Sequence, residues 1–366
     1  MSAADFQALG VDISKIPALA PPPGVIPNFV NPVSRAYQAQ IAVGICFPIM
    51  AVFVLLRVYC KLFVTQNWGF DDWTTMLAVA VACAFQGLGL SVIGHPLGPH
   101  QWNVPLSAFD DNFQKRSLSG SLAYHCTATL VKSAILLLYF RIFKPSKAAR
   151  LLIYGGIGTI VAFYLITFIT NLSLCVPRAS DVGGWTSATS QARCALPNQR
   201  LALGSGIFSF ISDVYVLSIP IFLVSALQLP LRRKIGVAAI FLTGTIACAC
   251  SLTSLIYRVR FNGQKDFAWT AVPVYTWSFA EVNIGIATGC MPTVAPLFRS
   301  ERRKGFRIPG LSYFRSRFSS NRSRQPLVHD PSYRPPYPEH PGMGALKNGD
   351  SHTELGSARS VAQDWP

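Results

Sequence analysis

Seven long runs of apolar residues, each almost free of charge, alternate with short polar segments along the chain. A helix needs roughly 20 mainly apolar residues to cross a hydrocarbon core about 30 Å thick. These runs are too long for barrel strands, and a helix satisfies its own backbone hydrogen bonds in lipid. The pattern predicts an all-α protein, a seven-transmembrane helix bundle, with spans at residues 36–63, 73–93, 118–143, 151–174, 201–227, 235–257 and 271–298.

The composition supports a lipid environment for most of the chain. Apolar residues make up 51% of the 366 residues, charged residues make up 13%, and the mean hydropathy is +0.35. A soluble protein of this length would lack the polar residues that cover a surface. We therefore exclude a soluble globular protein and expect membrane lipids as partners of the spans.

The segments that flank the seven spans differ from them in composition. Residues 1–35 contain the proline-rich stretch PALAPPPGVIP and lack the basic segment that opens a cleavable signal peptide. Residues 299–366 are rich in Arg, Ser and Pro and cannot bury enough apolar surface to fold. We predict an N-terminal tail (1–35), a seven-helix membrane domain (36–298) and a disordered basic tail (299–366).

Basic residues near the span ends predict the direction in which the chain crosses the membrane. The side that holds connections 1–2, 3–4, 5–6 and the C-terminal tail has a modest excess of Lys and Arg over the other side, where Arg258 and Arg260 follow the sixth span. We therefore predict an N-terminus outside the cytoplasm and a cytoplasmic tail. Membrane attachment favours anionic lipid over nucleic acid as a partner of that tail, so we expect no nucleic-acid partner.

Three charged residues stand near the middle of predicted spans, where an unpaired charge is costly. Lys132, Asp213 and Glu281 lie 14, 12 and 10 residues from the starts of the third, fifth and seventh spans. These three spans run in the same direction, so the depths agree within about 6 Å at 1.5 Å per residue. We predict one buried polar layer, which either fixes helix packing as an ion pair or triad or lines a ligand pocket or proton path.

A second group of charges gathers at the cytoplasmic rim. Asp71 and Asp72 begin the second span, where carboxylates suit the positive end of the helix dipole. Arg57 and Arg141 end the first and third spans on the same side. We predict rim ion pairs among these four residues, with either a structural role or the role of a conformational lock that opens on activation.

Most of the nine cysteines fall inside spans, where they act as small packing residues. Cys175 and Cys194 share one loop, and they can form a disulfide if that loop is extracytoplasmic. His95 and His100 lie in the loop between the second and third spans without a further Cys or His nearby, so we expect them to face solvent. No metal site is predicted.

Several segments in this order resemble a known family, the fungal rhodopsin-domain integral membrane proteins. The resemblance covers roughly residues 36–300, and its members include receptor-like surface-sensing proteins and a protein of the satratoxin gene cluster. It rests on GFDDW (69–73), KSAILLLYFRIF (132–143), the pair Cys175 and Cys194, DVYVLSIP (213–220), LRRKIGVAAIFLTG (231–244) and WSFAEVNIGIATGCMPTVAPLF (277–298). The resemblance implies a rhodopsin-like seven-helix bundle and does not supply a ligand.

The resemblance to rhodopsin does not extend to binding of a retinal pigment. A retinal protein needs a lysine on its seventh helix to form the Schiff base, and residues 271–298 contain none. Lys132 lies on the third span and cannot take that role. We therefore expect no retinal and no other cofactor.

Two functions remain in competition, with transport as a weaker third because no inverted repeat is apparent. The first is a receptor or sensor of an unknown small-molecule ligand in the plasma membrane, with a cytoplasmic signalling partner. The alternative is an enzyme or accessory protein of fungal secondary-metabolite biosynthesis in an endomembrane. There Asp213 and Glu281 are the candidate catalytic residues, because a carboxylic acid kept neutral by an apolar site can donate a proton.

Overall fold

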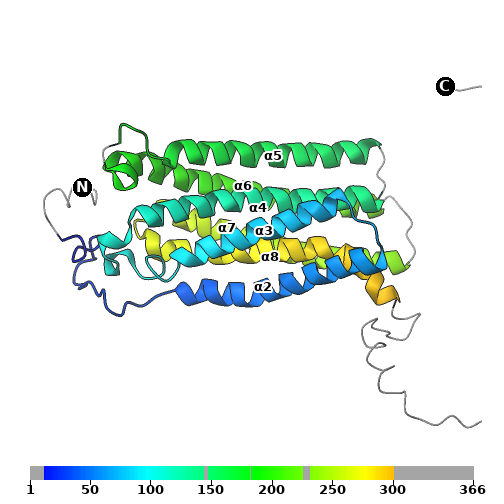
Figure 1. The fold of residues 1–366 in the computed structure, drawn as a ribbon, viewed down its shortest axis with the longest axis horizontal. Helices are drawn as coiled ribbons and strands as arrows, with labels where there is room; N and C mark the ends of the chain where they lie inside the picture. Colours follow the sequence, from blue (N-terminus) through cyan, green and yellow to red (C-terminus); the bar gives the residue numbers. More distant parts are fainter. Residues whose placement is uncertain (1–11, 144–146, 182, 226–230, 301–366) are drawn as a thin grey trace, which may run out of the picture. The chain divides into compact units, whose positions relative to one another are not determined.

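The computed structural model describes residues 12–143, 147–181, 183–225 and 231–300, and the predicted disordered tail therefore lies almost entirely outside the described residues. Within these ranges the protein is all-α, with seven long helices and no β-strand (Figure 1). The helices are α2 (Ala36–Tyr59), α3 (Phe70–Val92), α4 (Asp111–Phe143), α5 (Lys147–Cys175), α6 (Ala188–Ser225), α7 (Leu231–Phe261) and α8 (Phe267–Ser300).

Successive helices run in opposite directions, because short loops connect antiparallel neighbours (Figure 1). The even-numbered helices α2, α4, α6 and α8 begin at one end of the bundle, which we call the disulfide end because Cys175 and Cys194 lie there. The other end, where α2 passes into the π-helical turn η1 (Cys60–Val64), is called the Arg57 end.

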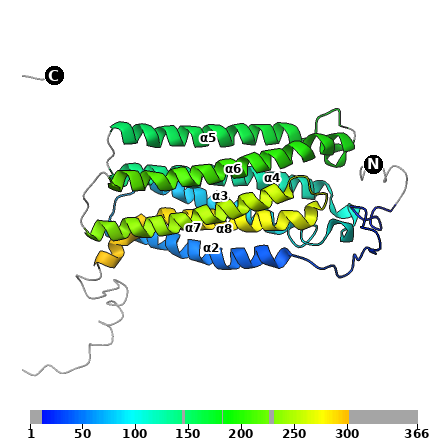
Figure 2. The ribbon, with the colours of Figure 1, turned by 180° about the vertical axis from the view of Figure 1, so that it is seen from behind.

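The helices α4 and α8 occupy the centre of the bundle. The first packs against α3, α5, α6 and α8, and the second packs against α2, α3, α4 and α7. Figures 1 and 2 show the two faces of this arrangement, with α3 and α8 nearer the viewer in one and α6 and α7 nearer in the other. Polar residues in the interior of the bundle, such as Lys132 on α4 and Glu281 on α8, are therefore shielded from lipid by the surrounding helices.

Six of the seven long helices in the described part of the chain are long and apolar enough to cross a membrane. The helix that does not meet this criterion is α8, on which Ser278, Glu281 and Asn283 are buried. A helix with neighbours on all sides need not be uniformly apolar, because those neighbours separate its polar groups from lipid.

Two helices begin well before the apolar runs predict, whereas α3, α5, α7 and α8 begin only three or four residues early. The helix α4 begins at Asp111 instead of residue 118, and α6 begins at Ala188 instead of residue 201. Hydropathy marks where a helix leaves the hydrocarbon layer, whereas backbone hydrogen bonding can continue beyond it. Both extensions lie at the disulfide end.

The N-terminal segment is tied to the loop between α3 and α4. Backbone hydrogen bonds join Ala18 N to the Val104 carbonyl over 2.9 Å and Leu106 N to the Ile16 carbonyl over 2.9 Å. Farther along, Arg35 N donates to the Gly98 carbonyl over 3.1 Å. This segment therefore forms part of the structure at the disulfide end.

The prediction that His100 faces solvent is wrong, whereas His95 is exposed as expected. The His100 ring stacks between Trp102 and Trp269, with centroid distances of 4.3 and 3.9 Å. Its Nδ1 lies 2.6 Å from an Asp266 carboxylate oxygen. Loop residues distant in sequence meet here, which spacing along the chain does not reveal.

Candidate functional site

Lys132 lies in the interior of the bundle, where its ammonium group has four oxygen partners. It donates to Asp213 Oδ1 over 2.6 Å and to Ser212 Oγ over 2.8 Å. It also lies 2.8 Å from the carbonyl oxygen and 3.0 Å from the Oγ atom of Ser209. All of these partners belong to α6, so the lysine fastens α4 to α6.

Glu281 joins the same network through a hydroxyl group. Ser209 Oγ donates to Glu281 Oε1 over 2.5 Å while it accepts from Lys132 Nζ. The second oxygens, Asp213 Oδ2 and Glu281 Oε2, are buried and have no hydrogen-bond partner in the described part of the chain. The structure therefore brings the three predicted residues into one layer that spans α4, α6 and α8.

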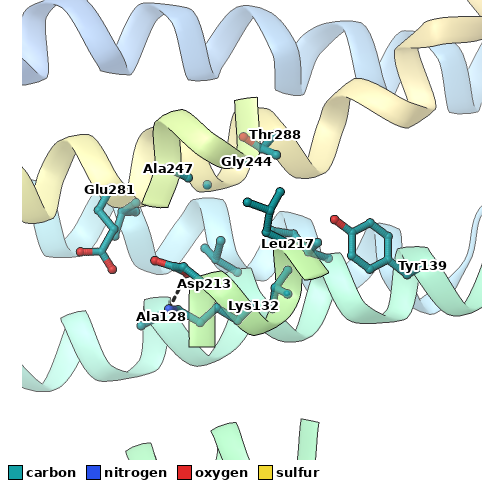
Figure 3. Close-up of a pocket in the computed structure, with 14 residues that line it drawn as sticks. Ala128, Lys132, Tyr139, Asp213, Leu217, Gly244, Ala247, Glu281 and Thr288 are labelled. Atoms are coloured by element: carbon teal, nitrogen blue, oxygen red, sulfur yellow. Dashed lines mark hydrogen bonds and ion pairs between the residues drawn. The ribbon is translucent and has the colours of Figure 1, made fainter. Parts of the chain in front are cut away.

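A cavity of about 50 Å³ adjoins this layer (Figure 3). Lys132, Asp213 and Glu281 lie at one end of it, and Tyr139 and Thr288 lie toward the Arg57 end. The walls between them are apolar or small, with Ala128, Val131, Ile135, Val216, Leu217, Gly244, Ala247, Val282 and Gly285. Such a cavity, polar at one end, can hold water or part of a small molecule.

The four rim residues form a buried network at the Arg57 end. The Arg57 guanidinium lies 2.8 Å from Asp71 Oδ2 and 2.8 Å from Asp72 Oδ1, and its side chain is only 2% exposed. Its Nη1 also donates to the Gly289 carbonyl of α8 over 2.8 Å. Arg141 approaches the same carboxylates from α4, with 2.7 Å to Asp71 Oδ1.

The carboxylates in this network also begin α3. Asp72 Oδ2 accepts from the Gly69 N–H over 2.9 Å and lies 2.8 Å from Lys61 Nζ. One cluster thus caps α3 and joins it to α2, α4 and α8. Arg57, Lys61, Asp71 and Asp72 are each at most 6% exposed, so most of this network is buried instead of lying at a solvated rim.

A disulfide joins Cys175 at the end of α5 to Cys194 in α6. The loop between them contains a second link, from Arg193 Nη2 to Asp181 Oδ2 over 2.9 Å. The Arg193 guanidinium and the Arg178 N–H hold the pKa of the Asp181 carboxyl below its usual value. The covalent bond and the ion pair fix the same loop at the disulfide end.

Sequence reasoning missed two buried polar features. Arg258 was expected just beyond the sixth span, but α7 continues to Phe261 and buries this side chain to 6% exposure. Ser251, Ser254 and Arg258 recur at the spacing of one helix face, and that periodicity was the available signal. In addition, Gln86 on α3 exchanges amide hydrogen bonds of 2.9 and 3.3 Å with Asn283 on α8.

Comparison with known proteins supports the resemblance noted above. The family model described as the fungal rhodopsin domain matches residues 56–300. The chain is similar to a SAT4 family membrane protein of Emericella nidulans, with 33% identity over 234 residues, which cover 63% of this chain and 57% of that relative. The chain thus spans little more than half of that relative.

Two further relatives carry the names of biosynthesis clusters. The chain is 23% identical over 290 residues to Fugralins biosynthesis cluster protein 2 of Gibberella zeae, with 77% of this chain and 71% of the relative covered. It is 21% identical over 281 residues to Polyenoic acids biosynthesis gene cluster protein Ba17b of Metarhizium anisopliae, with 73% and 75% covered.

Proposed function

Because this chain belongs to the fungal rhodopsin domain family, we propose that it is a non-photoactive seven-helix sensor of an extracellular or membrane-soluble small molecule. That it is an integral membrane protein follows from the family, from the SAT4 family relative and from the six apolar helices.

The proposed topology makes α8 the seventh span and puts the disulfide end outside the cytoplasm. Packing of α8 against α2, α3, α4 and α7 supports the seventh span, because a central helix lies at the same depth as its neighbours. A disulfide suits an oxidising compartment, which supports an external location for Cys175 and Cys194. Protease digestion of epitope tags at the two termini in sealed vesicles tests this topology. One tag should be cleaved and the other protected, and the same result for both tags would contradict the topology.

The observation that supports a sensor is the polar layer itself. Lys132, Ser209 and Glu281 link three helices beside a cavity, so a molecule that enters can exchange hydrogen bonds with groups from each helix. A ligand shifts a conformational equilibrium only through different contacts in the two states. A network shared by three helices provides such contacts.

Variants of this layer test the sensing role in the parent fungus. We expect a gene deletion and the variants Lys132→Met and Glu281→Gln to abolish the transcriptional response to the sensed molecule, with the metabolite profile of unstimulated cells unchanged. Asp12→Asn is the control, because Asp12 lies in the N-terminal segment with its side chain 58% exposed. Retention of the response in the layer variants, at normal protein levels, would contradict the proposal.

The second candidate function is an enzyme or accessory protein of a biosynthetic cluster. It is favoured by two relatives that are named for biosynthesis clusters. Glu281 is then the stronger candidate acid, because Lys132 contacts Asp213 directly and reaches Glu281 only through Ser209. Loss of one product and accumulation of one precursor in both the deletion and the Glu281→Gln strain would establish this function instead.

The absence of retinal chemistry is part of the proposal. The sequence of α8 contains no lysine, and the interior Lys132 lies on α4 with its ammonium bound to α6. We expect no visible absorption band when the purified protein is mixed with retinal. A band that survives washing and disappears in Lys132→Met would overturn this expectation.

The proposed location is the plasma membrane for a sensor and an endomembrane for a biosynthetic protein. The proposed cytoplasmic signalling partner would meet the Arg57 end. A fluorescent fusion expressed from the native promoter distinguishes the two membranes.

A further inference from the structure

Arg258 is a buried cation whose hydrogen-bond partners are all neutral. Its Nη1 donates to the Ala202 carbonyl over 2.9 Å and to Ser205 Oγ over 3.2 Å, and its Nη2 donates to Ser278 Oγ over 3.0 Å. Its Nε lies 3.4 Å from Ser254 Oγ. Within the described ranges no carboxylate contacts this guanidinium, which is an expensive arrangement for a charge in the interior.

The surrounding helices hold the guanidinium in place. The contacts above come from α6, α7 and α8, and the Tyr124 ring of α4 lies 5.0 Å from Arg258 Cζ. Gly206 permits this position, because a Cβ atom there would lie 2.6 Å from Arg258 Cδ. One N–H of Nη2 has no partner among these contacts, since a guanidinium has five N–H groups.

A cavity of about 110 Å³ lies beside Arg258. Three further polar atoms of its lining residues are buried without a partner in the described part of the chain: the Tyr124 hydroxyl, His125 Nδ1 and Asn171 Oδ1. Tyr124, His125 and Asn171 are at most 5% exposed. The rest of the lining combines four aromatic rings, those of Phe85, Phe261, Phe267 and Tyr275, with small apolar residues and with the polar side chains of four serines and Asn198.

A smaller cavity continues this space toward the loops of the disulfide end. It shares Ser117 and Asn198 with the larger cavity, and Trp185 and the Cys175–Cys194 disulfide also line it. The two cavities thus meet at lining residues of α4 and α6 on the side of the Arg258 cavity that faces the disulfide.

We propose that the Arg258 cavity binds an organic carboxylate, with the acid group at Arg258 and an apolar or aromatic body among the phenylalanine and tyrosine rings. An anion there would place a negative charge in direct contact with the guanidinium, and the Nη2 N–H and the Tyr124 hydroxyl can donate to it. The aromatic walls favour an organic body over an inorganic ion. The inference goes beyond the proposed function, because it concerns binding and holds for a sensor or an enzyme.

The test uses full-length protein purified in lipid nanodiscs. Thermal unfolding is followed while benzoate, trans-cinnamate or hexanoate is added, and each is compared with its uncharged amide and with sodium chloride. We expect saturable stabilisation by at least one carboxylate, with its amide at least about ten-fold weaker, as the loss of a charge-assisted hydrogen bond requires. Equal stabilisation by acid and amide, by chloride alone, or by none of the acids would overturn the proposal.

A pair of arginines on α7 provides the matched variants. Arg258→Gln is expected to weaken carboxylate binding by about ten-fold or more, whereas Arg260→Gln, two residues away and exposed, leaves it unchanged. Equal affinity in the two variants would contradict the assigned position. If Arg258→Gln does not fold, Ala271→Leu fills the cavity from α8 with Arg258 intact and is expected to abolish binding; full binding by this variant would also contradict the proposal.

Discussion

Lys132 and Glu281 lie on different helices and share one hydroxyl group, since Ser209 Oγ accepts from the lysine over 3.0 Å and donates to the glutamate over 2.5 Å. The serine hydroxyl has a single hydrogen, so its two bonds have fixed and opposite directions. Ser209 therefore connects the two charged groups through α6.

Two serines on α6 test how much this shared hydroxyl contributes. Ser209→Ala removes the only described hydrogen bond of the Glu281 carboxylate, and we expect a loss of about 1–3 kcal/mol in the free energy of unfolding. Ser212→Ala removes one of several Lys132 contacts, and about 1 kcal/mol or less is expected. Unfolding in mixed micelles measures the free energy of unfolding of both variants. Equal losses would show that the hydrogen bond from Ser209 to Glu281 contributes no more than the contact of Ser212.

The ion pair of Lys132 with Asp213 is expected to show strong coupling. Lys132→Met or Asp213→Asn leaves the other group without its partner, which costs about 3–5 kcal/mol for a buried pair. The double variant removes both groups, so its loss should be smaller than the sum by about 1–3 kcal/mol. A double-mutant cycle in the same micelles decides this, and additive losses would contradict a direct energetic link.

Arg57 and Arg141 contact the same carboxylates, but the Arg57 side chain is buried and the Arg141 side chain is partly exposed. Arg57→Gln leaves two buried carboxylates with reduced charge compensation, and we expect a loss of about 3 kcal/mol or more. Arg141 is 31% exposed, so Arg141→Gln should cost about 1 kcal/mol or less. The melting temperatures of the two variants provide the comparison. A larger loss of stability in Arg141→Gln than in Arg57→Gln would contradict this prediction.

Gly204 and Gly206 form a matched pair on α6. An alanine at Gly206 would bring its Cβ against Arg258, and overpacking of this kind costs about 1–3 kcal/mol. An added Cβ at Gly204 meets nothing within 4 Å, so Gly204→Ala should be neutral or stabilising by up to about 1 kcal/mol. Thermal unfolding of the two variants tests this prediction, which fails if they behave alike.

The loop at the disulfide end should loosen in acid. Asp181 has a folded-state pKa below its ordinary value of 3.8, mainly because of Arg193, so the pair stabilises the loop above that value. This stabilisation is lost as the pH falls through the folded-state pKa. Amide hydrogen exchange of the loop between about pH 5 and pH 2, corrected for intrinsic rates, should show the change. Asp181→Asn should remove it, and Asp12→Asn should leave it intact.

The hydrophobic runs predicted all seven long helices in the described ranges, because the need to span lipid determines where such runs occur. They did not predict the early starts of α4 and α6, where helical hydrogen bonding extends beyond the apolar residues. The run at 271–298 predicted α8, but this helix is less apolar than the other six because it carries buried polar residues such as Glu281 and Asn283.

Counting residues brought Lys132, Asp213 and Glu281 to one depth, because depth depends only on position along a helix. The burial of Arg258 was signalled only by its spacing from Ser251 and Ser254, whereas the bridging role of Ser209 depends on which helix faces meet, and one sequence does not contain that information. A charge also ends an apolar run, so Arg258 was assigned to a loop. The function of the three-residue layer stays a prediction.

The central position of α8 has a consequence for synthesis in the cell. A translocon releases a segment into lipid according to its own hydropathy, and α8 is the long helix that falls short in this respect. It is also the last of the described helices to leave the ribosome. Its insertion should therefore depend on the earlier helices, with Gln86 available for Asn283 and Arg57 for the Gly289 carbonyl. A lesion in α2 or α3 would then appear as failed membrane integration of a helix encoded some 200 residues downstream.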